Sequence, residues 1–145
     1  RVNRNGQFNV PLGTKTAVLM DSDDFEAVAK ALAAAELVSA DFEQIVDSCG
    51  ENDLVFADPP YTVKHNNNGF VKYNERLFSW SDQERLKAAL QRAAQRGARV
   101  VVSNADHPSV RQLYAGWDVE TLFRHSVMAS ESVRRRRTSE VLIRR

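Results

Sequence analysis

Apolar residues follow two different spacings along this chain, and the spacing predicts which segments are strands and which are helices. Short continuous apolar runs predict strands, at 16–20, 37–40, 54–57 and 99–102. Apolar residues that recur every three or four positions predict helices, at 25–33, 42–49, 81–96 and 110–116. Two further apolar runs, at 119–127 and 139–143, predict a closing pair of strands. Alternating strands and helices are typical of an α/β domain.

Residues at the expected helix ends predict where three of these helices begin or stop. A cap region at 21–22 precedes the first helix, and Ser81 and Glu84 have the spacing of a capping box. Gly50 is expected to end the second helix in a left-handed conformation.

One predicted strand ends abruptly in an acid, two prolines and an aromatic residue. Leu54–Ala57 is continuously apolar, which predicts a strand that is buried on both faces. Pro59 and Pro60 cannot donate hydrogen bonds to a strand ladder, so the strand must end before them. Asp58 and Tyr61 are therefore expected at the carboxyl edge of the sheet, where open α/β sheets bind ligands.

This string of residues suits the activation of an amino group on a nucleobase. Such a nitrogen is a poor nucleophile, because its lone pair is delocalised into the ring. The Asp58 carboxylate and the Pro59 carbonyl could each accept one N–H, which would orient the nitrogen and favour the charge that develops on it. The Tyr61 ring offers a stacking surface for a base, worth about 1–3 kcal/mol. The plainer interpretation is a strand that ends in a proline turn.

A second strand is expected to end at the same edge. The crossover between 54–57 and 99–102 contains one helix, which predicts a parallel, right-handed βαβ unit. Asn104, just after the second strand, would then lie near Asp58. Either Asn104 lines a base pocket or it belongs to a polar turn that caps the next helix.

The long polar stretch after Tyr61 interleaves aromatic and basic residues. Phe70 and Tyr73 are interpreted as a lid over an extruded base, and Lys72 as a phosphate contact. Phe78 is expected instead to anchor this loop to the domain core.

Composition excludes several other classes of protein. The 145 residues are 43% hydrophobic and 27% charged with a net charge of +1, an ordinary globular balance. No apolar run approaches the roughly 20 residues of a membrane span, and no signal peptide is recognisable. Cys49 is the only cysteine, which predicts a reducing compartment, and it shares no metal-ligand spacing with the three histidines.

Positive charge is concentrated near the end of the chain. Four consecutive arginines, Arg134, Arg135, Arg136 and Arg137, lie between the last two predicted strands. They are interpreted as contacts to nucleic-acid phosphates, with a solvated loop as the alternative.

Three strings resemble Dam-type DNA adenine-N6 methyltransferases of the D12 class, or α-group. Asp58–Tyr61 resembles their DPPY motif, and the SNAD string at 103–106 occurs in the same order. The segment at 1–13, RVNRNGQFNVPLG, resembles their target-recognition segment. The family's F-x-x-Y followed by F-[ST] is also present, as Phe70, Tyr73, Phe78 and Ser79.

The resemblance implies methyl transfer from S-adenosylmethionine to N6 of a flipped adenine in double-stranded DNA. It assigns catalysis to Asp58, Pro59, Pro60 and Tyr61, with Asp58 also beside the cofactor. It implies a base pocket that includes Phe70, Tyr73 and Asn104. DNA contacts are expected from Arg1, Asn3, Asn5 and Asn9, together with Lys72 and Arg134–Arg137. Dam enzymes that read GATC carry an arginine where Asn5 stands, so the target sequence stays open.

The resemblance also implies a three-layer, Rossmann-like sheet that ends in an antiparallel hairpin. Residues 1–15 would end a target-recognition segment, and 16–145 would form the C-terminal part of a catalytic domain. The family's cofactor-binding F-x-G-x-G turn is absent from this sequence, so a preceding part of the same protein is expected to supply it. The resemblance further implies a cytoplasmic enzyme of restriction–modification type, encoded by a bacterium or a phage. Neither a membrane nor a metal is expected as a partner. The alternatives are a catalytically incomplete DNA-binding remnant, or methylation of cytosine N4 or a protein glutamine.

Overall fold

The computed structural model describes residues 5–8, 19, 22–63, 77–125 and 137–145, which belong to two compact units, Arg1–Ser39 and Ala40–Arg145. The first unit contains helix α1 (Phe25–Ala33), as the apolar spacing predicts. The Asp24 side chain accepts a hydrogen bond from the Ala27 N–H at 2.8 Å, so the helix cap lies after the expected region at 21–22. No residue of α1 is buried. The predicted domain boundary at 15/16 falls outside the described residues.

The second unit is built on a four-stranded mixed sheet. Its strands are β1 (Leu54–Ala57), β2 (Arg99–Ala105), β3 (Asp118–His125) and β4 (Arg137–Arg144), in the order β1-β2-β4-β3. β1 and β2 are parallel, whereas β4 pairs antiparallel with both β2 and β3. The predicted parallel unit and the closing hairpin are therefore confirmed. The strand predicted at 37–40 is wrong, because these residues join no ladder and Leu37 and Val38 are exposed.

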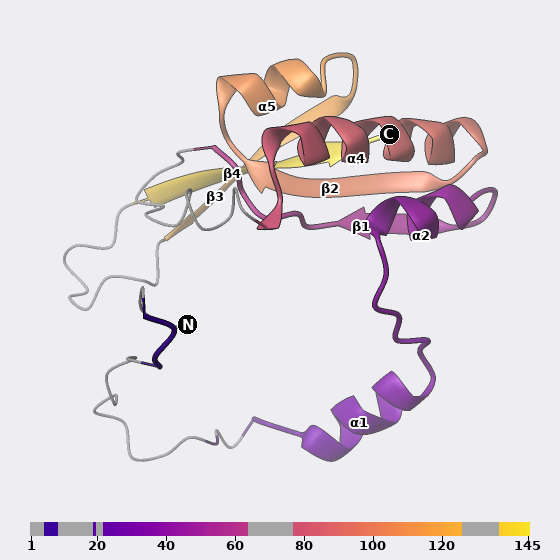
Figure 1. The fold of residues 1–145 in the computed structure, drawn as a ribbon, viewed down its shortest axis with the longest axis vertical. Helices are drawn as coiled ribbons and strands as arrows, with labels where there is room; N and C mark the ends of the chain where they lie inside the picture. Colours follow the sequence, from indigo (N-terminus) through magenta and orange to yellow (C-terminus); the bar gives the residue numbers. More distant parts are fainter. Residues whose placement is uncertain (1–4, 9–18, 20–21, 64–76, 126–136) are drawn as a thin grey trace. The chain divides into compact units, whose positions relative to one another are not determined.

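Three helices of this unit pack over one face of the sheet: α2 (Phe42–Ser48), α4 (Trp80–Gln95) and α5 (Pro108–Leu113) (Figure 1). Alternation along β2 decides which side chains they cover, since Val100 and Val102 are buried and Arg99 is exposed. The core joins these valines to residues of all three helices and of β4. Its largest fully buried apolar members are Tyr114, Leu90, Ile143, Val100, Val102, Val110 and Val141.

The opposite face of the sheet is not covered by any helix within the described part of this unit. β1 is an edge strand whose burial alternates, and Leu54 and Phe56 remain 66% and 62% exposed. Val55 and Ala57, by contrast, pack against the core. The prediction that Leu54–Ala57 is buried on both faces is therefore wrong for this chain, because the described residues form two layers.

The N-terminus of α4 is fixed by a capping box that lies two residues before the predicted one. Ser79 is the N-cap, and its backbone N–H donates to Asp82 Oδ2 at 2.8 Å. Hydrogen bonds from Ser79 lower the pKa of the Asp82 carboxyl. Glu84, expected to close the box, accepts instead from the Trp80 indole N–H at 3.0 Å. Phe78 is buried and lies 5.7 Å from Phe42 between ring centroids, which confirms its anchoring role.

The end of α2 differs from the prediction. The cap residue Cys49 is extended, with φ −81° and ψ 146°, and the left-handed residue in the following turn is Asn52, with φ 70°, rather than Gly50. The Arg96 guanidinium binds the carbonyls at this helix end, because it donates to Val46 O and Cys49 O at 3.0 and 2.8 Å.

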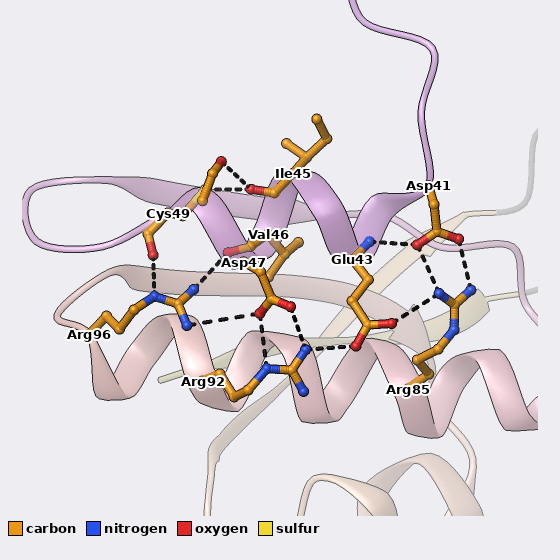
Figure 2. A network of polar contacts seen from close by, with 10 residues as sticks. Asp41, Glu43, Ile45, Val46, Asp47, Cys49, Arg85, Arg92 and Arg96 are labelled. Atoms are coloured by element: carbon orange, nitrogen blue, oxygen red, sulfur yellow. Dashed lines mark hydrogen bonds and ion pairs between the residues drawn. The ribbon is translucent and has the colours of Figure 1, made fainter.

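α2 and α4 are joined along their length by an ion-pair ladder, which Figure 2 shows from close by. Arg85 contacts Asp41 and Glu43 at 2.8 and 3.1 Å. Further along, Arg92 contacts Glu43 and Asp47 at 2.7 and 2.8 Å. The hydrogen bonds from Arg85 and Arg92 lower the pKa values of the Asp41 and Asp47 carboxyls. These ion pairs hold α2 against α4. The chain passes from α2 into β1, and α4 begins beside the candidate site.

Candidate active site

Asp58 is the first residue after β1, and its carboxylate lies at the carboxyl edge of the sheet. The register pairs Ala57 with Val102, so the next residues along, Asp58 and Ser103, are neighbours. The Ser103 hydroxyl donates a hydrogen bond to Asp58 Oδ1. Asp58 is exposed and forms no ion pair with a described lysine or arginine. The result is an accessible carboxylate that one neighbouring side chain orients.

The residues after Asp58 run inward and then outward again. Pro59 is buried, Pro60 is exposed and Tyr61 is half-buried. The Pro60 carbonyl accepts a hydrogen bond from Gln83 Nε2 at 3.2 Å. This segment is therefore attached to the first turn of α4 as well as to β2.

Asn104 does not lie at the exposed edge. The strand predicted at 99–102 continues to Ala105, so Ser103 and Asn104 point to opposite faces of the sheet. Asn104 is 0% exposed on the face covered by helices. Its Nδ2 donates to Gln83 Oε1 at 3.1 Å, and its Oδ1 accepts from the Ala105 N–H at 2.8 Å. Its amide thus holds Gln83 in the interior.

Asp106, the acid that ends the SNAD string at 103–106, also has a nearby partner. Asp106 pairs with Arg111 at 2.7 Å, and Arg111 in turn donates to the Thr121 hydroxyl at 2.6 Å. These contacts tie the end of β2 to α5 and β3.

Most of the residues predicted to contact DNA or the flipped base lie outside the described part of the chain. Asn5 is exposed, in a turn that Gly6 continues with φ 76°. Arg137 is the first residue of β4, and its backbone is paired with His125. The other predicted residues lie outside the described ones, namely Arg1, Asn3, Asn9, Phe70, Lys72, Tyr73, Arg134, Arg135 and Arg136.

Two residues at the site were not predicted from the sequence, although each carried a signal. The parallel pairing of the two strands, together with their register, would have placed Ser103 beside Asp58. Gln83 lies three positions before Leu86, on the apolar stripe of its helix, and a polar residue on a buried stripe requires a buried partner.

Two other kinds of site are absent from the described residues. None of the helices there is long and apolar enough to cross a membrane. No group of three or more His, Cys, Asp or Glu side chains in these same segments could hold a metal ion.

Comparison with known proteins assigns a family to this arrangement. The family model for D12 class N6 adenine-specific DNA methyltransferase matches residues 1–131. The DNA N-6-adenine-methyltransferase of Escherichia phage P1 is 36% identical over 137 residues, covering 92% of this chain and 18% of that protein. The type II methyltransferase M1.LlaDCHI of Lactococcus lactis subsp. cremoris is 29% identical over 146 residues, covering 99% and 51%. The DNA adenine methylase of Vibrio cholerae serotype O1 is 25% identical over 143 residues, covering 98% and 52%. The chain thus spans about half the length of the last two relatives and less of the first.

Proposed function

Because this chain belongs to the D12 class of N6 adenine-specific DNA methyltransferases, we propose that its protein methylates N6 of adenine at specific sites in double-stranded DNA. The observation that carries the proposal is the Asp58 carboxylate. It is exposed at the end of a parallel strand, oriented by Ser103 and followed at once by two prolines and Tyr61.

In this proposal the target adenine leaves the duplex, because its amino group is otherwise paired, and unstacking it costs a few kcal/mol. Tyr61 stacks on the flipped base. Asp58 and the Pro59 carbonyl accept hydrogen bonds from the two amino N–H groups and would hold the nitrogen in line with the methyl group. The nitrogen forms one new bond to carbon as the carbon–sulfur bond of the donor breaks, and one proton is released to water.

S-Adenosylmethionine is the proposed donor, and the described residues fit it in part. It would supply an electrophilic methyl group, and the exposed Asp58 carboxylate is suited to lie near its positive charge. The F-x-G-x-G pattern does not occur among these 145 residues. We extend the proposal to a three-layer sheet in which further strands pair with the edge of β1 and a third layer covers Leu54 and Phe56.

DNA contact is proposed for residues that precede the candidate site in the sequence and for residues that follow it. Arg1, Asn3, Asn5 and Asn9 are proposed to read the target, since asparagine pairs bidentately with adenine and arginine with guanine. Lys72 and Arg134–Arg137 are proposed to neutralise phosphates, with Phe70 and Tyr73 over the flipped base. We also propose a cytoplasmic location in a bacterial or phage-infected cell, since relatives come from Escherichia phage P1 and Vibrio cholerae.

The test uses the full-length protein with S-adenosylmethionine and duplex DNA, followed by nuclease digestion and mass spectrometry of the nucleosides. We expect N6-methyladenine, and expect Asp58→Ala to remove most of it. N4-methylcytosine in this assay, or a methylated glutamine in a parallel assay with protein as the acceptor, would replace the proposal with a different amino acceptor. Tight DNA binding without any methylated product would identify a DNA-binding protein that does not catalyse transfer.

A further inference from the structure

A chain of two buried amides connects β2, α4 and the segment that follows β1. It runs from Asn104 through Gln83 to the Pro60 carbonyl. We infer that Gln83 and Asn104 are positioning residues that fix the direction in which the chain leaves Pro60, and so fix the Tyr61 ring relative to the Asp58 carboxylate. This inference rests on the proposed function, in which Tyr61 and Asp58 hold the same base.

Between the Asp58 Cα atom and the Tyr61 side chain, the sequence leaves two backbone dihedral angles unrestricted, ψ of Pro60 and φ of Tyr61. Asp58 precedes a proline, which restricts it to extended conformations, and the same holds for Pro59. Proline rings fix φ at both 59 and 60. Pro60 precedes Tyr61, however, so its ψ angle has no such restriction. The Gln83 amide binds the Pro60 carbonyl, the group that this ψ angle rotates.

The amide chain also has a defined direction. The Ala105 N–H donates to Asn104 Oδ1, so the Asn104 amide must present its NH₂ group to Gln83. Gln83 Oε1 accepts from that NH₂ group, which leaves Gln83 Nε2 to face Pro60. A backbone N–H of β2 thus determines which end of the Gln83 amide points at the Pro60 carbonyl.

Burial makes this arrangement specific. Gln83 and Asn104 are both 0% exposed, so no bulk water can replace a lost partner. A glutamine accepts and donates at once, whereas a glutamate carboxylate only accepts. Ser103, adjacent to Asn104, binds Asp58 on the opposite face of the sheet. Two consecutive residues of β2 therefore act on this segment, Ser103 directly at Asp58 and Asn104 through Gln83 at Pro60.

The test compares Gln83→Glu and Gln83→Met with the same changes at Gln91 in the full-length protein. Gln91 is a matched control, because it lies on the same helix and its Oε1 accepts from the Trp117 indole at 3.2 Å, away from Pro60. We expect kcat for adenine methylation to fall about 10- to 100-fold in Gln83→Met at every pH, and in Gln83→Glu at a pH where the introduced carboxyl is ionised, with KM for DNA changed far less. The Gln91 variants should stay within about twofold of the parent.

A pH profile separates positioning from general damage to the fold. Once protonated, the introduced carboxyl of Gln83→Glu can donate to Pro60 while it accepts from Asn104, so its kcat relative to the parent should recover as pH falls. Gln83→Met should show no recovery. A kcat of Gln83→Glu that stays low at every pH would overturn the inference.

A second readout does not depend on catalysis. With fluorotyrosine incorporated, and the Tyr61 ¹⁹F resonance assigned from its loss in Tyr61→Phe, that resonance should shift or broaden in Gln83→Met and Gln83→Glu. Gln91→Met should leave it unchanged. An unmoved Tyr61 resonance would overturn the inference even if the protein methylates adenine. Absence of methylated adenine in the parent protein would instead overturn the proposed function.

Discussion

The hydrogen bond between Ser103 and Asp58 predicts a specific pattern in a double-mutant cycle. Ser103→Ala removes the hydroxyl that donates to Asp58 Oδ1. Hydrogen bonds to charged groups contribute about 1.5–3 kcal/mol, and the low end applies here because water reaches the exposed carboxylate. We therefore expect the rate of methyl transfer to fall about tenfold, since 1.4 kcal/mol is a factor of ten. Asp58→Ala should cost about 10²- to 10³-fold, through loss of a preorganised polar contact.

The two effects should not add. Ser103 acts through Asp58, so the double variant should be as slow as Asp58→Ala alone, giving a coupling free energy of about 1.4 kcal/mol. The assay is single-turnover transfer from tritium-labelled S-adenosylmethionine to a duplex with the target site. Ser48→Ala is the control, because its hydroxyl bonds the Ile45 carbonyl at the end of α2. A double variant about tenfold slower than Asp58→Ala would refute the reasoning.

Four further predictions concern stability, association and DNA binding. Leu90→Ala should lower the free energy of unfolding in urea by about 2–5 kcal/mol, because Leu90 is fully buried; a smaller loss would mean that the core collapses around the gap. The hydrogen bond from Arg92 lowers the pKa of Asp47 from its ordinary 3.8, so this carboxyl stabilises the fold above that pH and ceases to do so as pH falls below it. In Asp47→Asn, the urea concentration at the unfolding midpoint should therefore fall less steeply as the pH drops below 3.8. An unchanged pH dependence would contradict a stabilising role for the Arg92–Asp47 ion pair. Phe56→Lys on the exposed edge strand β1 should reduce self-association of the 145-residue chain, measured by light scattering, and leave its circular dichroism spectrum unchanged. Unchanged self-association would mean that another surface mediates it. Changing Arg134–Arg137 to glutamine should reduce the slope of log K for DNA against log salt by up to about 0.9 per arginine, and an unchanged slope would make that segment a solvated loop.

Much of the candidate site was predictable because its determinants are local. The two prolines require β1 to end just before Asp58, whichever strands surround it. A strand–helix–strand crossover then brings the carboxyl end of the next parallel strand beside Asp58. The position of Asn104 was not predictable in the same way. A strand only three residues longer than expected moved Asn104 from a turn to the buried face, because successive residues of a strand alternate between faces.

By itself, then, the sequence determined the parallel pairing of β1 with β2, the closing hairpin and the place where the acid and the aromatic residue follow β1. It also determined the order of the described elements, apart from the strand wrongly predicted at 37–40. Periodicity and proline stereochemistry suffice for these, because they act over a few residues. Only the tertiary structure decided that Leu54 and Phe56 face outward, and that Gln83 reaches across 23 positions to Pro60 and 21 positions to Asn104. Burial and the direction of an amide depend on which distant groups surround a side chain, and no local pattern in the sequence contains that information.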